Sequence, residues 1–213
     1  MTRQELQQLV TLGEGVSLEF KRKVPRPTRI AKELIALANT HGGRILLGVD
    51  DNGSILGVED AAEEAFLLHQ AAETHCQPPV TYSTERIVIA PRRDVVLVHV
   101  PESTDKPHCL VNGTNTPGTA YIRVNERSME ADPESVRLMR EEQPSASMTL
   151  QFGENESLLM RYLDDYGRIT VEQFARLANI PLYRASQTLV SMAEANVLRA
   201  HTGRSEEYFT LAY

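Results

Sequence analysis

The chain has 213 residues, of which 41% are hydrophobic and 24% charged, with a net charge of −7. This composition is that of an ordinary globular protein, and the acidic balance argues against binding nucleic acid over the whole surface while leaving room for a local basic patch. No apolar run approaches the ~20 residues of a membrane span, and the N-terminus lacks the apolar segment of a signal peptide. Two cysteines make no disulfide framework, so we expect a cytoplasmic protein without membrane contact.

The first 140 residues predict a mixture of helices and strands without repeats. Helical periodicity, with Thr28 as an N-cap and with Phe66, Leu67, Ala71 and Ala72 facing inward, predicts helices at 3–12, 28–39, 61–74 and 133–142. Alternating or continuous apolar runs predict strands at 16–21, 44–49, 80–90, 94–100, 108–111 and 120–124. The Asp-Asn-Gly at 51–53 favours a tight hairpin. Because these elements do not alternate strictly, the predicted class is α+β.

The last third of the chain has a different pattern. Residues 142–154 are polar, rich in small residues and without periodicity, which is typical of a linker. We therefore expect domains at 1–144 and 154–213, separated by a linker at 145–153. Three predicted helices followed by two strands around a turn indicate a winged helix-turn-helix.

The predicted winged helix offers side chains that suit a DNA groove. Its third helix would present Tyr183, Arg184 and Gln187 outward, and its wing would present Arg199, His201 and Arg204. However, residues 151–213 contain six arginines and no lysine against eight acidic residues, whereas a typical DNA reader is basic. Dimerisation or protein contact therefore remains an alternative for this domain.

Two glutamates and an aspartate form the candidate catalytic group. Glu19 lies on the polar face of a predicted strand with a charged open face, and Glu14 lies just before it. If the strand that ends at Asp51 lies alongside, three carboxylates converge, which suits Mg²⁺ or Mn²⁺ in phosphodiester hydrolysis. Lys21, on the same face as Glu19, would then stabilise the negative transition state. The alternative is that Glu19 and Lys21 form surface pairs and that Asp51 only initiates the turn.

A dense basic run follows the first strand. Between Phe20 and Glu33 only Glu33 is acidic, and six residues are basic: Lys21, Arg22, Lys23, Arg26, Arg29 and Lys32. Such a run can place several cations beside a phosphate backbone, where each neutralised phosphate adds affinity through counterion release. The alternative is an ordinary solvated helix face.

Five separated motifs carry a family resemblance. They are E-x-x-x-x-E-F-K (Glu14–Lys21), A-N-T-x-G-G (Ala38–Gly43), G-V-D-D-x-G (Gly48–Gly53), K-P-H (Lys106–His108) and A-Y-I-R-V (Ala120–Val124). Because these motifs occur in this order, residues 13 to about 140 resemble the Schlafen AlbA domain. The resemblance implies a nucleic-acid-associated domain and, with a fused winged helix, a DNA-binding regulator.

The resemblance also implies specific site residues. Certain animal Schlafen proteins are tRNA and rRNA endonucleases, and their motif positions correspond here to Glu14, Glu19 and Asp51, with Asp50 as an alternative for the third. Animal members also hold a zinc ion with His and Cys ligands in broadly the region of His75, Cys76, His108 and Cys109. Since neighbouring strand residues face opposite ways and C-x-x-C spacing is absent, buried thiols and structural histidines explain these four residues better.

The sequence supports three hypotheses. The leading one is a nucleic-acid-binding regulator, expected to be a homo-oligomer that binds DNA or structured RNA. The second is a metal-dependent endoribonuclease. The third is a non-catalytic interaction module of a larger assembly.

Overall fold

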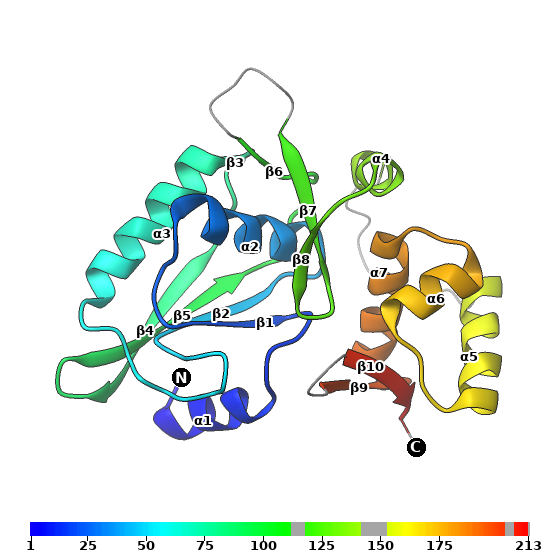
Figure 1. Cartoon of the computed structure of the whole chain (residues 1–213), viewed down its shortest axis with the longest axis horizontal. Coiled ribbons are helices and arrows are strands. Elements are labelled where there is room, and N and C mark those ends of the chain that lie inside the picture. Colours follow the sequence, from blue (N-terminus) through cyan, green and yellow to red (C-terminus); the bar gives the residue numbers. More distant parts are fainter. Residues whose placement is uncertain (112–117, 142–152, 203–206, 213) are drawn as a thin grey trace. The chain divides into compact units, whose positions relative to one another are not determined.

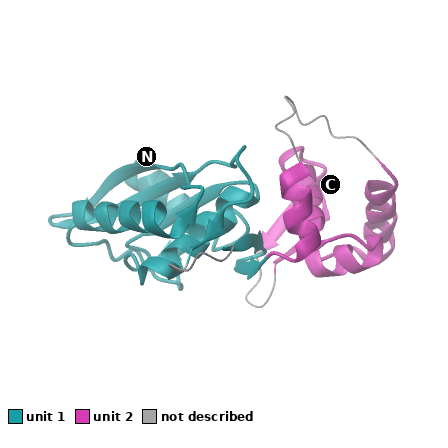
Figure 2. Cartoon of the chain, turned by 90° about the horizontal axis from the view of Figure 1, so that it is seen from above, with its two compact units in different colours: residues 1–130 teal, residues 131–213 magenta. Residues whose placement is uncertain are grey.

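The computed structural model describes residues 1–111, 118–141, 153–202 and 207–212. The chain divides into two compact units, residues 1–130 and 131–213, which Figure 2 shows in different colours. Helices and strands are mixed along the chain, which confirms the predicted α+β class. The helix expected at 133–142 belongs to the second unit, while the domain limits proposed from the sequence placed it in the first.

The larger sheet of the first unit has the strand order β1-β2-β5-β4 (Figure 1). Strand β1 runs parallel to β2, and the other neighbours are antiparallel. The strands span Leu18–Lys21 (β1), Gly43–Leu47 (β2), Ser83–Ala90 (β4) and Arg93–Val100 (β5). The helices of this unit are α1 (Arg3–Thr11), α2 (Pro27–Asn39) and α3 (Ala61–His75).

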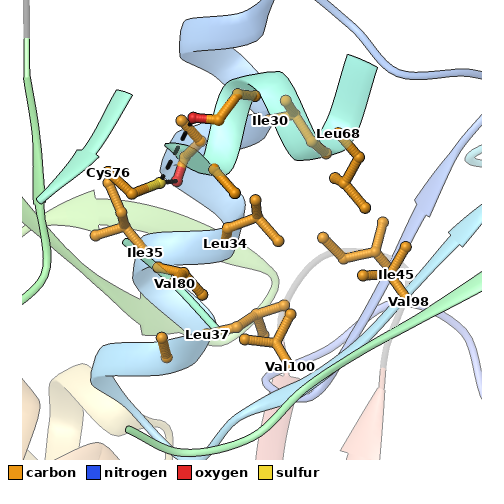
Figure 3. Packing of buried hydrophobic residues seen from close by; sticks show 14 of the residues in the cluster. Ile30, Leu34, Ile35, Leu37, Ile45, Leu68, Cys76, Val80, Val98 and Val100 are labelled. Atoms are coloured by element: carbon orange, nitrogen blue, oxygen red, sulfur yellow. Dashed lines mark hydrogen bonds between the residues drawn. The ribbon is translucent and has the colours of Figure 1, made fainter. Parts of the chain in front are cut away.

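Both faces of this sheet are covered. Alternate residues of β2 point to opposite sides, so Ile45 and Leu47 join a hydrophobic cluster with α2 and α3. Leu46 and Phe20 join a second cluster that includes Leu6 of α1. Figure 3 shows the larger cluster, to which α2 contributes more side chains than any other helix or strand.

A second, antiparallel sheet has the order β3-β6-β7-β8. Its strands span Cys76–Gln77 (β3), Cys109–Leu110 (β6), Thr119–Val124 (β7) and Arg127–Glu130 (β8). Helix α2 contacts β6, β7 and β8 as well as β5 of the first sheet. Because α2 has sheet on more than one side, every residue from Leu34 to Asn39 is buried.

Helix α2 begins one residue earlier than predicted. Thr28 is not the N-cap, since the helix starts at Pro27 and Arg26 takes the cap position without a side-chain hydrogen bond. The fixed φ of proline suits the first helical position, where no N–H is needed. After the helix, Gly42 adopts φ +72°, and a Cβ at this position would lie 2.5 Å from the carbonyl oxygen of Val100. The turn into β2 therefore requires glycine here.

The predicted inward face of α3 was partly wrong. Phe66 is 63% exposed, whereas Leu68, Ala71 and Ala72 are buried. These three residues are spaced by three and four and so define one face of the helix. Phe66 lies two positions before Leu68, about 200° around the helix axis, and consequently points to solvent.

The described residues of the second unit form four helices and a hairpin. The helices are α4 (Pro133–Glu141), α5 (Glu154–Tyr166), α6 (Val171–Ala178) and α7 (Leu182–Glu194), and the hairpin strands are β9 (Leu198–Thr202) and β10 (Glu207–Leu211). Two helix ends follow local signals: Thr170 accepts the N–H of Gln173 at 3.2 Å at the start of α6, and Gly167 ends α5 in the left-handed region. In the described parts of both units, no helix combines the length and apolarity needed to cross a membrane.

Candidate functional site

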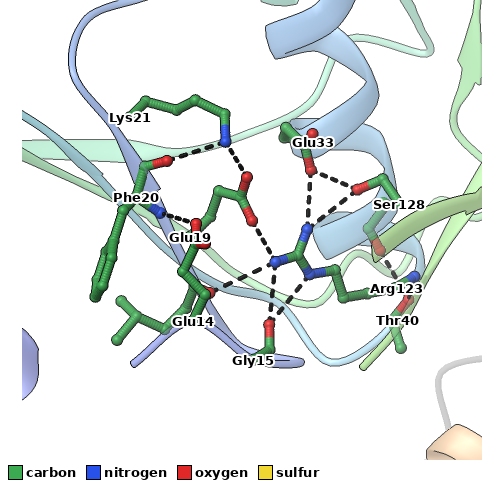
Figure 4. A network of polar contacts seen from close by, with 11 residues as sticks. Glu14, Gly15, Glu19, Phe20, Lys21, Glu33, Thr40, Arg123 and Ser128 are labelled. Carbon is green, nitrogen blue, oxygen red and sulfur yellow. Dashed lines mark hydrogen bonds and ion pairs between the residues drawn. The ribbon is translucent and has the colours of Figure 1, made fainter. Parts of the chain in front are cut away.

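A buried arginine, Arg123 of β7, lies at the centre of the polar cluster in the first unit (Figure 4). It is 1% exposed and pairs with Glu19 of β1 and with Glu33 of α2, the latter at 2.9 Å. Its Nη2 and Nε also donate to the carbonyl oxygen of Gly15 at 3.1 and 3.2 Å. Sequence reasoning missed Arg123, although an arginine inside the apolar run Tyr-Ile-Arg-Val was a usable signal, because a buried charge needs partners.

Glu19 is buried, in contrast to the predicted charged open face. It is 5% exposed, and its two carboxylate oxygens accept from Lys21 Nζ and Arg123 Nη2. The face of β1 that carries Glu19 is covered because α2 and β7 provide Glu33 and Arg123 on that side. Glu19 and Lys21 do form the pair expected from the alternative interpretation, but Glu19 is buried in it.

Glu14 lies beside this cluster. Its Oε1 accepts the backbone N–H of Phe20 at 2.8 Å. Burial raises the pKa of Glu14, the bond from Phe20 opposes that shift, and the charges of Glu19 and Asp51 add to it. The structure therefore brings Glu14 and Glu19 together, and Asp51 influences Glu14 electrostatically from an exposed position.

Asp50 and Asp51 begin the turn after β2. Gly53 N–H donates to the carbonyl oxygen of Asp50 at 2.8 Å, and Val49 and Ile55 form a single bridge instead of a long hairpin. Asp50 also pairs with Arg22 at 2.7 Å, and this hydrogen bond lowers the pKa of Asp50. Asp50, the alternative third carboxylate, is thus engaged with a cation.

The carboxylates do not form a donor set suited to Mg²⁺ or Mn²⁺. Hard cations need several free oxygen ligands, but both oxygens of Glu19 accept from cationic groups and one oxygen of Glu14 accepts a backbone N–H. Across the described ranges no three His, Cys, Asp or Glu side chains are grouped so as to hold a metal ion. The donor set therefore does not fit the three-carboxylate metal site that the resemblance implies.

His108 has hydrogen-bond partners on both ring nitrogens. Nδ1 lies 2.7 Å from the carbonyl oxygen of Pro78, which can only accept, so Nδ1 carries the proton. Nε2 then accepts from Ser103 Oγ at 2.6 Å. Burial lowers the pKa of His108, so the neutral ring is favoured in this structural role.

The thiols differ in accessibility. Cys76 is buried in the hydrophobic cluster of Figure 3, and burial raises the pKa of this thiol to about 12. Cys109 is half-buried, with Sγ 3.9 Å from the carbonyl oxygen of Pro107. The imidazole of His75 lies 3.4 Å from the carbonyl oxygen of Val111.

The basic run separates into engaged and available cations. Lys21 belongs to the Glu19 cluster, Arg22 pairs with Asp50, and Lys32 lies 4.8 Å from the centroid of the Tyr121 ring.

In contrast, the exposed side chains of Arg26 and Arg29 form no hydrogen bond or ion pair with the part of the chain that the structure describes. Lys23, also exposed, has Glu64 as an electrostatic neighbour. We call Lys23, Arg26 and Arg29 the exposed basic group.

The predicted residues of α7 are only partly at the surface. Tyr183 is fully buried, so its outward placement was wrong; its spacing of three from Ser186 and Leu189 puts it on the core side of α7. Arg184 is exposed, whereas Gln187 is half-buried and donates to Tyr183 Oη at 3.3 Å. Arg204 lies outside the described residues.

Comparison with known families assigns the first unit. The family described as Schlafen, AlbA_2 matches residues 14–132, more than half of the chain. The protein therefore belongs to the Schlafen AlbA_2 family. No curated protein matches the sequence.

Two solved structures are similar to this chain. The DIP2311 protein from Corynebacterium diphtheriae is 17% identical with a TM-score of 0.44, and the match covers 71% of this chain but only 30% of that protein. The N-terminal domain of a protein from Nitrosomonas europaea, described as related to the ATP-dependent DNA helicase RecG, is 18% identical with a TM-score of 0.42. That match covers 72% of this chain and 99% of the domain.

Proposed function

We propose that this protein is a nucleic-acid-binding regulator whose first unit contacts phosphates through the exposed basic group. The single observation that carries the proposal is that Arg26 and Arg29 extend from the start of α2 without acidic partners among the described residues. Cations that are not neutralised within the protein are available to replace the counterions of a phosphate backbone. Membership of the Schlafen AlbA_2 family supports a nucleic-acid-related role.

The second unit is proposed to be a winged helix-turn-helix that adds DNA binding or dimerisation. Three helices (α5, α6 and α7) precede a two-stranded hairpin, and the short connection between α6 and α7 contains Asn179 in the left-handed region. Arg184 is exposed on α7, in the first turn of the helix that would enter a major groove. A homo-oligomer is part of this proposal, because winged helices commonly bind paired half-sites as dimers.

The test is binding of fluorescently labelled duplex DNA and structured RNA by the full chain at several salt concentrations. Wild type should bind with an affinity that falls as salt rises. The double variant Arg26→Gln/Arg29→Gln should bind more weakly to every sequence. The slope of log affinity against log salt concentration should also be shallower, by the equivalent of roughly one to two phosphate contacts.

The matched control is Arg137→Gln. Arg137 is also an exposed arginine, but it pairs with Glu141 at 2.9 Å. If the control weakens binding as much as the double variant, the effect is one of net charge and the assignment to the exposed basic group is wrong. If wild type binds neither nucleic acid at low salt, the regulator hypothesis is lost and a non-catalytic interaction module is favoured. Light scattering on the same samples tests the oligomer.

The endoribonuclease hypothesis has weaker support. Glu14 and Glu19 are close in space, but the Glu19 carboxylate is occupied by Lys21 and Arg123. We therefore expect no cleavage of tRNA, with or without Mn²⁺, that depends on Glu19. Cleavage by wild type that disappears in Glu19→Gln, with folding retained, would revive the hypothesis.

A further inference from the structure

The outer face of the β9–β10 hairpin in the second unit carries an ordered stack of planar groups. In the antiparallel register, His201 pairs with Tyr208 and Arg199 with Thr210, so these four side chains share one face. The opposite face is the core side, where Leu198 and Phe209 are 2% and 1% exposed. The outer face is therefore not needed for the core of the unit.

The rings on this face are held in a fixed arrangement. The centroids of His201 and Tyr208 are 4.9 Å apart and the ring planes are inclined by 10°, which is close to parallel. On the same ring of Tyr208, the guanidinium carbon of Arg168 lies 5.6 Å from the centroid. Arg168 is positioned by its neighbour Ile169, which forms a bridge with Phe209 of β10.

The histidine ring is also fixed by a hydrogen bond. His201 Nε2 lies 2.9 Å from Thr210 Oγ1, and this hydroxyl donates its own hydrogen to the carbonyl oxygen of Leu211. The hydroxyl oxygen therefore accepts from His201, and Nε2 carries a proton. Because the stack is ordered before any ligand binds, a ligand would not have to immobilise these side chains.

The charge of this face is opposite to that of the unit around it. Arg168 and Arg199 are exposed, and the described outward positions of β9 and β10 hold no acidic residue. A ligand that matches the face must combine planar rings with negative charge. Unpaired nucleotides do so, because their bases can stack on aromatic or guanidinium planes while their phosphates pair with arginine. Bases inside a duplex are already stacked on each other and do not offer these planes.

We propose that the stack formed by Arg168, Tyr208 and His201, together with Arg199, is a binding surface for single-stranded nucleic acid. This surface differs from the exposed basic group of the first unit and from the predicted groove-binding helix α7. It contacts unpaired bases in addition to phosphates. This surface therefore differs from the other two in preferring single-stranded to duplex nucleic acid, and the preference depends on the planar side chains.

The experiment measures binding of fluorescein-labelled oligothymidylate of 15 nucleotides to the full chain by anisotropy, with a duplex of the same length in parallel. An oligouridylate arm compares RNA with DNA. Tyr208→Leu keeps an apolar side chain but removes the central ring, and Arg168→Gln removes the cation above it. Each variant should weaken single-strand binding roughly tenfold, the effect expected for the loss of one stacked base. Duplex binding should change much less.

Arg161→Gln is the matched control, because Arg161 is exposed on α5 and donates to the carbonyl oxygen of Ser157 in its own helix. Circular dichroism melting checks that each variant is folded. Cross-linking of a bromodeoxyuridine oligonucleotide gives a second readout and should label the peptide that contains Tyr208.

Three outcomes overturn the proposal: wild type fails to bind oligothymidylate, folded Tyr208→Leu binds it as tightly as wild type, or Arg161→Gln weakens it equally. The result also separates this proposal from the proposed function. Arg26→Gln/Arg29→Gln acts through phosphates and should weaken single strands and duplex alike, whereas the hairpin variants should act on single strands selectively.

Discussion

The guanidinium group of Arg123 on β7 pairs with the carboxylate of Glu19 on β1, 104 residues earlier in the chain. Both side chains are buried, and Arg123 also reaches Glu33 of α2. This contact connects the two sheets of the first unit and the helix that lies against both. It also joins the E-x-x-x-x-E-F-K and A-Y-I-R-V motifs, which are far apart in the sequence.

Replacing Arg123 with methionine should strongly destabilise the first unit. The change leaves the buried carboxylate of Glu19 with one cation instead of two, and it removes the donors to Gly15. Breaking a buried ion pair on one side typically costs about 3–5 kcal/mol. Urea denaturation measures the loss. The exposed control Arg137→Met should cost less than about 1 kcal/mol, and a similar cost for both variants would contradict a structural role of the buried pair.

Replacing Glu14 with glutamine should change how stability depends on pH. Because burial raises the pKa of Glu14 in the folded state, the folded protein binds this proton more tightly than the unfolded chain, whose value is near 4.5. The contribution of Glu14 to the stability of the folded state is therefore present below pH 4.5 and is lost as the pH rises through the pKa of Glu14 in the folded protein. The stability of Glu14→Gln relative to wild type should consequently improve between pH 4 and pH 7.

The opposite trend is expected for Asp50→Asn. The hydrogen bond from Arg22 lowers the pKa of Asp50 in the folded protein. The contribution of Asp50 to the stability of the folded state is therefore present above pH 3.8, the pKa in the unfolded chain, and is lost as the pH falls through the lower pKa of the folded protein. The disadvantage of this variant should therefore be larger at pH 7 than at pH 3. Denaturant titrations of wild type and both variants give the comparison, and parallel pH profiles for the two variants would show that these assignments are wrong.

The two thiols should react at different rates. Burial raises the pKa of Cys76 to about 12 and shields its sulfur, whereas Cys109 is half-buried. Since the thiolate is the reactive form, a disulfide reagent at pH 8 should modify one thiol per folded chain. Cys109→Ser should abolish this rapid phase, and Cys76→Ser should leave it intact. Two equally fast thiols in the folded protein would contradict the burial of Cys76.

Asn39 should be essential for joining α2 to the second sheet. Its amide nitrogen donates to the carbonyl oxygens of His108 and Tyr121, each at 2.9 Å, and its oxygen accepts the N–H of His108 at 2.8 Å. Asn39→Leu leaves these buried groups unpaired, which should cost about 3 kcal/mol or more in free energy of unfolding. The control Gln70→Leu, at an exposed position of α3, should change the free energy of unfolding by about 0.5 kcal/mol at most. Equal effects would refute this role.

Local sequence determined much of the secondary structure. The period of apolar residues and the local start and stop signals predicted helices close to α1, α3 and α4, because these signals act over short stretches of chain. The five motifs also sufficed to identify the Schlafen AlbA_2 family. The proximity of Glu14 and Glu19 was predictable for the same reason, since they are five positions apart on one segment.

Only the tertiary structure decided which charged residues are buried and with which partners. Strand alternation placed Glu19 on a polar face of β1, but it could not show that α2 and β7 cover that face, because β7 lies about a hundred residues away. Likewise, the structure and not the sequence prediction placed Tyr183 in the core. The sequence therefore established the local elements, the family and the basic run. Glu19, the proposed metal ligand, pairs with Arg123 in the folded protein, because a carboxylate removed from water requires a cation close by.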